Sequence, residues 1–168
     1  MPELPEAEVA ARQLRERVVG ATVRDCWIGR EDIVREGLPS LDQYRQAKIA
    51  GVERKGKSVI LHFLCGKEPR FLVAELGMTG LLLFRSTLTK HPQHTHFILH
   101  LDGCCEPDIR YWNPRRFGRL SLLDRAGLDR YVARRFGHDP LTISHEQFLR
   151  VLRATRSRLK SLLMHQQV

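Results

Sequence analysis

The chain has 168 residues, of which 42% are hydrophobic, with 12 glycines and 8 prolines. This is the size of one ordinary domain or of two small ones. The longest apolar runs have the length of strands, so membrane-spanning, collagenous and disordered chains are excluded. The acidic, proline-rich N-terminus lacks the basic and apolar regions of a secretory signal, and we therefore expect a cytoplasmic protein.

The charge of the chain is concentrated in one segment. Lysine and arginine number 28 against 19 acidic residues, which gives a net charge of +9. Residues 110–160 contain 13 basic side chains, twelve of them arginine, and only four acids, while the remainder is balanced. Because arginine binds phosphate through two parallel hydrogen bonds, we infer a polyanionic partner. A basic face that only keeps the protein soluble is the alternative.

The four cysteines do not predict a metal site. Cys26 and Cys65 are isolated, and Cys104 and Cys105 are adjacent, so no pair has the two-residue spacing of a zinc ligand pair. We expect reduced thiols and no metal in this chain.

The first predicted element is a helix from Pro5 to about Val18. Proline suits the first turn, Glu6 and Glu8 suit the positive end of the helix, and Gly20 suits its stop. One face of this helix is apolar and is formed by Ala7, Ala10, Leu14 and Val18.

After this helix the apolar period changes to two, which is typical of strands. Glycine and proline separate most of the runs, for example Lys55-Gly56 between the second and the third. Many short strands close together favour an antiparallel sandwich or barrel. The predicted strands are Thr22–Ile28, Lys48–Glu53, Ser58–Leu64, Phe71–Leu76, Leu81–Phe84, His96–Leu101, Ile109–Trp112 and Arg119–Leu123.

From about Leu128 the pattern becomes helical. Ser144 and Gln147 form a capping box before an apolar run, and a second helical pattern continues to Val168 without a stop signal. We therefore predict an α+β fold. An N-terminal helix with an antiparallel β-sandwich or barrel occupies residues 1–127, and a partial helical domain, truncated at the C-terminus, occupies residues 128–168.

The N-terminus carries the groups of a possible amine nucleophile. Removal of Met1 would leave Pro2 as a secondary amine, and an α-amino group has a pKa of about 7.7–8.0. Such an amine can attack a sugar C1′ and form an iminium, with Glu3 and Glu6 as proton donor and relay. From spacing alone, an acidic helix start explains the same residues at least as well.

Four motifs in order carry a resemblance to a known family. They are Met1-Pro2-Glu3-Leu4-Pro5-Glu6, Lys57 after Arg54-Lys55-Gly56, Leu76-Gly77-Met78-Thr79-Gly80, and Asn113-Pro114-Arg115-Arg116-Phe117-Gly118. In these motifs the chain resembles the formamidopyrimidine-DNA glycosylases of the Fpg/Nei superfamily. The helical tail resembles the helix–two-turn–helix region of that family.

The resemblance implies a role for each matching residue. Pro2 is the expected nucleophile, Glu3 the general acid, Glu6 a supporting carboxylate, and Lys57 a contact to the DNA backbone beside the lesion. Family enzymes flip the damaged base out of the duplex and fill the void with three side chains. Here those positions are occupied by Met78, Arg115 and Phe117, with Arg116 beside them as a further DNA-binding residue.

We call Met78, Arg115 and Phe117, the three side chains expected to fill the void, the wedge residues. Two of them, and two histidines, also have a purely structural interpretation. Without the resemblance, Met78 and Phe117 are more typical of core residues. The resemblance also implies a histidine after Lys90 that contacts phosphate, and both His91 and His94 are candidates, with ordinary surface histidines as the alternative.

The resemblance also shows what this sequence lacks. The family continues with a Gly-Asn-Ile-Tyr segment and a four-cysteine zinc finger, and neither occurs in these 168 residues. The structural zinc of the full-length family therefore has no site in this chain, and we expect no other cofactor.

The implied function is base-excision repair, by release of oxidised purines such as 8-oxoguanine and formamidopyrimidines and by nicking at the abasic site. The implied partner is double-stranded DNA with oxidised bases or abasic sites, and the protein is expected to act as a monomer at the nucleoid. We expect the chain to be a truncated, weakly active or inactive form. The alternatives are an endonuclease VIII-like glycosylase for oxidised pyrimidines and a non-catalytic DNA-binding fragment.

Overall fold

The computed structural model describes residues 2–66, 68–85, 92–154 and 157–164. Helix α1 spans Leu4–Val18, with Pro5 in its first turn and Glu3 as its N-cap residue. Its buried residues are Ala7, Ala11, Leu14 and Val18, so Ala11 takes the buried place predicted for Ala10, which is only partly buried. Gly20, at φ 93°, follows the end of the helix and lets the chain turn into the first strand.

The described residues form one nine-stranded sheet in the order β2-β9-β5-β4-β3-β1-β7-β8-β6. Eight of the strands were predicted, with ends that differ by at most a few residues. The pairs are antiparallel except β2 with β9, which is parallel. The strands are β1 (Thr22–Ile28), β2 (Val34–Glu36), β3 (Lys48–Lys55), β4 (Ser58–Cys65), β5 (Glu68–Glu75), β6 (Leu81–Phe84), β7 (Thr95–Asp102), β8 (Asp108–Trp112) and β9 (Leu120–Leu123).

The sheet folds over into two layers around the main core. Leu61 of β4, Leu72 of β5 and Leu99 of β7 belong to one buried cluster, together with the inner face of α1. The Tyr111 hydroxyl of β8 donates to the Glu75 carbonyl at the end of β5 at 2.6 Å, which joins two strands from opposite halves of the strand order. The predicted α+β fold with a β-sandwich is confirmed. The parallel β2–β9 pair is a departure from the predicted antiparallel pairing.

A second, smaller core lies on the outer face of the sheet. Helix α2 spans Arg125–Arg135, with Asp124 as its N-cap, and contributes Leu128 to this core. Along β4, Ile60 faces this outer core while its neighbour Leu61 faces the main core. Strands β4 and β5 are therefore covered on both faces, which explains their nearly continuous apolar sequences.

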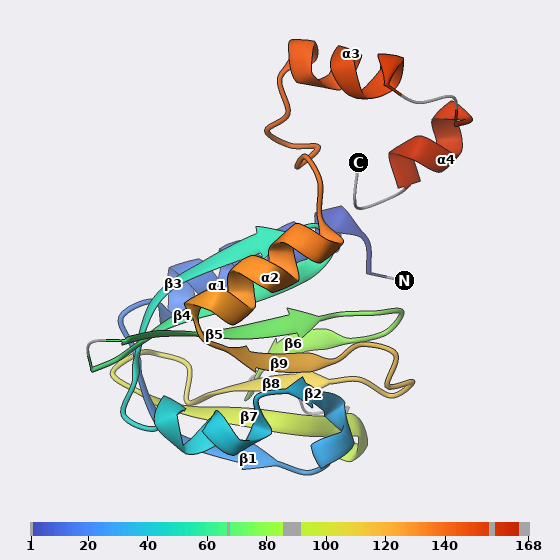
Figure 1. The fold of residues 1–168 in the computed structure, drawn as a ribbon. Coiled ribbons are helices and arrows are strands. Elements are labelled where there is room, and N and C mark those ends of the chain that lie inside the picture. Colours follow the sequence, from blue (N-terminus) through green and yellow to red (C-terminus); the bar gives the residue numbers. More distant parts are fainter. Residues whose placement is uncertain (1, 67, 86–91, 155–156, 165–168) are drawn as a thin grey trace.

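The remaining helices are short. Within the described residues, the structure has the 3₁₀ helices η1 (Glu31–Ile33), η2 (Leu38–Tyr44) and η4 (Pro92–His94). Helix α3 spans His145–Arg153 and begins with the predicted Ser144–Gln147 capping box, and α4 spans Leu159–Met164. Figure 1 shows α3 and α4 beyond the C-terminal end of α2, away from the sheet. The division at residues 127 and 128 stays a prediction, and α2 runs across that point.

Membrane-spanning helices are not found in the described part of the chain, where every helix is too short or too polar to cross a bilayer.

Candidate active site

The N-terminal residues are fixed by the start of α1. Pro2 is buried, Glu3 is half-buried, and Glu6 is exposed on the first turn. The Glu3 N–H donates to Oε2 of Glu6 at 2.8 Å, and this hydrogen bond is the largest cause that lowers the pKa of the Glu6 carboxyl. Glu6 therefore caps the helix as a carboxylate and holds the backbone of Glu3 in place.

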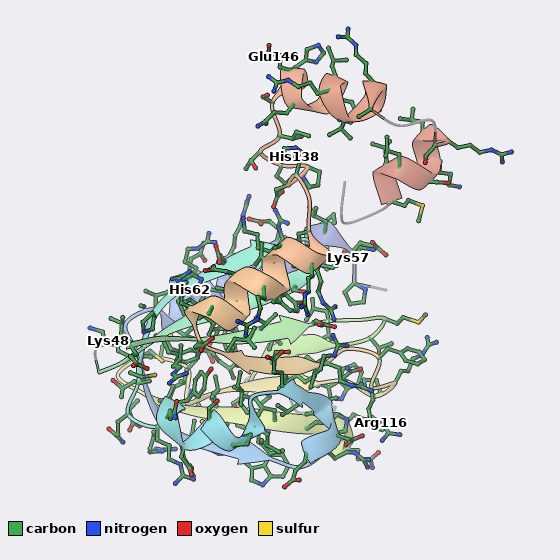
Figure 2. The ribbon with its side chains drawn as sticks, in the orientation of Figure 1. Lys48, Lys57, His62, Arg116, His138 and Glu146 are labelled. Carbon is green, nitrogen blue, oxygen red and sulfur yellow. The ribbon has the colours of Figure 1, made fainter. Side chains whose placement is uncertain are left out.

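Lys57 comes next to Glu3 although the two lie far apart in the sequence. It occupies a two-residue turn between β3 and β4, where Gly56 has a φ of 53° that favours glycine. The Lys57 ammonium forms an ion pair with Oε2 of Glu3, and both side chains remain partly exposed. Figure 2 shows Lys57 at the end of the sheet next to the N-terminus. Of the four residues predicted to form the catalytic site, which are Pro2, Glu3, Glu6 and Lys57, two are therefore in direct contact, Glu3 and Lys57.

A cavity of about 850 Å³ opens at this ion pair. Its size falls within the range of small-molecule sites. Glu3 and Lys57 lie at one end, and the segment after α2 and helices α3 and α4 supply the rest of the wall. That wall is mostly apolar and includes Phe136, Pro140, Ile143, Phe148, Val151 and Leu162.

The three predicted wedge residues lie on two loops that touch. Met78 follows β5, and Arg115 and Phe117 lie between β8 and β9. A Cβ on Gly77 would come within 2.4 Å of the Gly118 nitrogen, so the two backbones meet where only glycine fits. Phe117 is 58% exposed, with the Arg115 guanidinium 5.2 Å from its ring centroid. Phe117 is therefore no core residue, and Met78 is half-buried.

Asn113 joins the two wedge loops; it was named as the first residue of a motif, but without a role of its own. It is fully buried. Its Oδ1 accepts from the Arg116 N–H at 3.0 Å and from the Thr79 hydroxyl at 3.3 Å, and its Nδ2 donates to the Tyr111 hydroxyl at 2.9 Å. The Asn-Pro pair signals a turn, and two of the partners are local, but the contact with Thr79, 34 residues away, forms only in the folded chain.

The remaining predicted contacts are separate from the Glu3–Lys57 pair. His91 lies outside the described residues, while His94 is exposed, with its ring 6.1 Å from that of Trp112. Arg116 has a φ of 53° and pairs with Asp32 at 3.6 Å. Figure 2 shows Lys57 and Arg116 well apart. The structure therefore brings together Glu3 with Lys57 and Met78 with Arg115 and Phe117.

The described residues do not fit a structural zinc. Among them, no three histidine, cysteine or acidic side chains are close enough together to hold a metal ion. Cys26 is buried on β1, and the Cys104 thiol donates to the Glu106 carbonyl at 3.1 Å. Burial raises the pKa of Cys26 to about 12, which keeps its thiol protonated.

Comparison with known proteins decides the family. Residues 1–120 match the model of the formamidopyrimidine-DNA glycosylase N-terminal domain. The chain belongs to this family. Formamidopyrimidine-DNA glycosylases from Desulforamulus reducens and Thermomicrobium roseum are 33% and 35% identical over 99% of this chain, which covers 60% and 62% of their lengths.

Solved structures of this glycosylase family show the same fold. A Lactococcus lactis Fpg in complex with abasic-site DNA matches with a TM-score of 0.80 over 98% of this chain and 61% of that one, at 23% identity. A second match, also with a TM-score of 0.80, is the same enzyme with DNA that contains FAPY-dG. The chain spans about three-fifths of the length of the curated relatives that it matches.

Proposed function

We propose that this chain supplies the catalytic N-terminal part of a DNA glycosylase that also cleaves abasic sites. The observation that carries this proposal is the ion pair between Lys57 and Glu3, the residue that follows Pro2, at one end of a cavity. Imine chemistry on a nucleotide sugar needs an amine as the nucleophile, a carboxyl group as the proton donor and a cation to bind the neighbouring phosphate. Pro2, Glu3 and Lys57 carry these three groups.

The reaction is proposed to start at the Pro2 nitrogen after removal of Met1. The amine attacks C1′ of the damaged nucleotide, and the base leaves with the bonding electrons and takes up the proton that the amine nitrogen loses. Glu3 then protonates the ring oxygen O4′ as the C1′–O4′ bond breaks, which leaves an iminium between Pro2 and C1′. Loss of a C2′ proton expels the 3′-phosphate, and a second elimination releases the 5′-phosphate.

The other residues of the site bind and position the DNA. Lys57 is proposed to exchange its contact with Glu3 for a backbone phosphate, which leaves the Glu3 carboxyl directed at the sugar. Met78 and Phe117 replace the stacking of the flipped base, and Arg115 can hydrogen-bond the orphaned partner base. Arg116 and His94 are proposed as further DNA contacts. No cofactor takes part in these steps.

The proposed substrate is double-stranded DNA with oxidised purines, which the protein would meet as a monomer in the cytoplasm. The Lactococcus lactis Fpg matched here was crystallised with DNA that contains FAPY-dG, a ring-opened purine. The lesion class is tested by comparing base release from duplexes with 8-oxoguanine and with thymine glycol. Faster release of thymine glycol would contradict the assignment to purines.

Trapping with borohydride tests the covalent step. The 168-residue chain, with Met1 removed, is incubated with abasic-site DNA and sodium borohydride, which reduces each iminium irreversibly, so that even slow formation accumulates. We expect a protein–DNA band that disappears in Pro2→Ala and in a preparation that keeps Met1, because the Pro2 nitrogen is then an amide. No trapping by the processed chain, or equal trapping by Pro2→Ala, would overturn the proposal.

A further inference from the structure

A buried arginine lies behind the candidate active site. Arg54 belongs to β3, and its side chain is only 5% exposed. Its Nε donates to Oε2 of Glu8 at 2.8 Å, one terminal nitrogen donates to the Gly56 carbonyl at 3.1 Å, and the other donates to both carboxylate oxygens of Asp139, at 2.8 and 2.7 Å. All three nitrogens of the guanidinium are therefore in use.

The three partners come from three different parts of the fold. Glu8 is on α1, the helix that starts directly after Pro2 and is capped by Glu3. Gly56 is the neighbour of Lys57 in the β3–β4 turn. Asp139 lies between α2 and α3, in the segment that leads to the helical part of the cavity wall. One side chain thus connects the helix of the nucleophile, the turn of the lysine and the entry to the helices.

Asp139 organises its own segment as well. Its side chain accepts from the Leu141 N–H at 3.0 Å, and its carbonyl accepts from the N–H groups of Thr142 and Ile143 at 3.0 and 2.8 Å. A displacement of the Asp139 carboxylate would therefore move the whole turn before α3.

The carboxylates around Arg54 compensate the cost of burying its positive charge. Hydrogen bonds from Arg12 and Arg54 hold the pKa of Glu8 below its usual range. Burial acts to raise the pKa of Asp139, but hydrogen bonds from Arg54 and from the Leu141 N–H outweigh it and lower that pKa. Both carboxyl groups are therefore anionic at neutral pH. Removing one partner of such a buried set leaves an uncompensated charge, so the arrangement tolerates little displacement.

We propose that Arg54 is a positioning residue, which holds the Lys57 turn against helix α1 and couples both to the segment that leads into helices α3 and α4. The proposal rests on the proposed function, since it assigns Arg54 to the placement of the Glu3–Lys57 pair. Lysine cannot replace it, because a single ammonium cannot donate in three fixed directions to Glu8, Gly56 and Asp139 together.

The kinetic test uses single-turnover trapping of abasic-site DNA with borohydride. The variants are Arg54→Lys, Asp139→Asn and, as a matched control, Arg12→Ala. Arg12 donates to the same Glu8 carboxylate at 2.8 Å, but its side chain is 65% exposed and contacts neither the turn nor Asp139 in any described interaction. Melting temperatures identify variants that fail to fold.

Arg54→Lys should slow trapping at saturating DNA by about tenfold to a hundredfold, because displacements near 1 Å at a reacting centre have effects of this size. The DNA concentration for half-maximal trapping should stay within about twofold, since Arg54 is buried and cannot reach phosphate. Asp139→Asn should slow the same step to a smaller extent, and Arg12→Ala should leave it unchanged. Trapping by Arg54→Lys at the wild-type rate would overturn the proposal while leaving the proposed function intact.

Hydrogen exchange without DNA gives a readout that does not depend on activity. Asp139→Asn should speed exchange at residues 55–58, and Arg54→Lys should speed it at residues 141–143 as well, while β7 and the Arg12→Ala control stay unchanged. If the wild-type chain traps no DNA, the proposed function fails, and this exchange pattern still decides the coupling. The coupling would be contradicted if Asp139→Asn left hydrogen exchange at residues 55–58 unchanged, or if exchange rose uniformly over the whole chain.

Discussion

At the scale of single residues, the contact of Lys57 with Glu3 explains how a turn lysine becomes part of a site. Lys57→Ala should weaken binding to every DNA duplex and reduce the slope of log affinity against log salt by about one, because one phosphate is no longer neutralised. The matched control is Lys48→Ala at the other end of β3, which Figure 2 shows far from Lys57. Filter binding over a salt series measures both slopes. An unchanged slope in Lys57→Ala would refute its assignment to phosphate.

Asn113 and Phe117 lie on the same loop, but truncation to alanine should affect stability at Asn113 and DNA discrimination at Phe117. Asn113→Ala removes the buried side-chain amide that bonds the Arg116 N–H, the Thr79 hydroxyl and the Tyr111 hydroxyl, and should lower the free energy of unfolding by about 1–3 kcal/mol. Phe117→Ala removes an exposed ring, and should leave stability unchanged but weaken discrimination of damaged from intact duplex. Urea unfolding and competitive binding separate the two. The reverse pattern would contradict both assignments.

The candidate site could be predicted from sequence only in part. The N-terminal motif, Lys57 and the wedge residues were named because each lies in a short motif that resembles the family, and their roles stay predictions. Arg54 and its role could not be found this way, because its partners Glu8 and Asp139 lie 46 and 85 residues away in the chain. An arginine just after a predicted strand and before a glycine turn gives no signal that it is buried, and only the folded chain reveals it.

At the scale of elements, strands were easier to predict than their pairing. Period-two patterns and glycine turns located eight strands, whereas β2 was missed, since Val34–Glu36 has only three residues and is held by main-chain pairing with β9. Helix α2 begins at Arg125, before the expected change of pattern at Leu128. Its cap is Asp124, whose side chain accepts from the Gly127 N–H at 2.6 Å.

Helix α3 depends on its cap more than on packing. None of its residues is buried, and the Gln147 N–H donates to the Ser144 hydroxyl at 3.2 Å. Ser144→Ala should therefore destabilise α3 by about 1 kcal/mol and speed exchange at residues 147–153, while the melting of the sheet stays the same. Ser161→Ala, in the interior of α4 at an exposed position, should be neutral or slightly stabilising. A decrease in global stability for Ser144→Ala would contradict the local role.

Acid should release the segment around Asp139. The folded-state pKa of Asp139 is lowered from its ordinary value of 3.8, so its contribution to stability is complete above that value and is lost as the pH falls through the folded-state pKa below it. The Leu141 amide, which donates to Asp139, should shift in NMR spectra over this acidic range. Asp139→Asn should remove that transition while leaving acid unfolding of the sheet. A transition that persists in the variant would assign it to another carboxyl group.

At the scale of the whole molecule, the excess positive charge is concentrated in one segment of the chain. Residues 110–160 hold basic residues in excess by nine, which equals the net charge of the chain. In the fold this segment begins within β8, carries the wedge loop with Arg115, and continues through α2 and α3 towards the cavity wall. The positive charge is therefore arranged along the same part of the molecule as the candidate site, and the rest of the chain is balanced.

Binding of the 168-residue chain to DNA should consequently be weak and strongly dependent on salt. The slope of log affinity against log salt concentration should depend on the positions of the positive charges as well as on their number. Each phosphate that the protein no longer neutralises reduces that slope by about 0.9, so removing charges within residues 110–160 should flatten it for damaged and intact duplexes alike. Removing three exposed charges elsewhere should leave it nearly unchanged, although both triple variants have the same net charge. The two triple variants replace with glutamine, respectively, Arg116, Arg130 and Arg153, and Arg24, Arg45 and Lys48. Equal flattening in both would mean that DNA responds to total charge alone, and that the basic segment forms no binding surface.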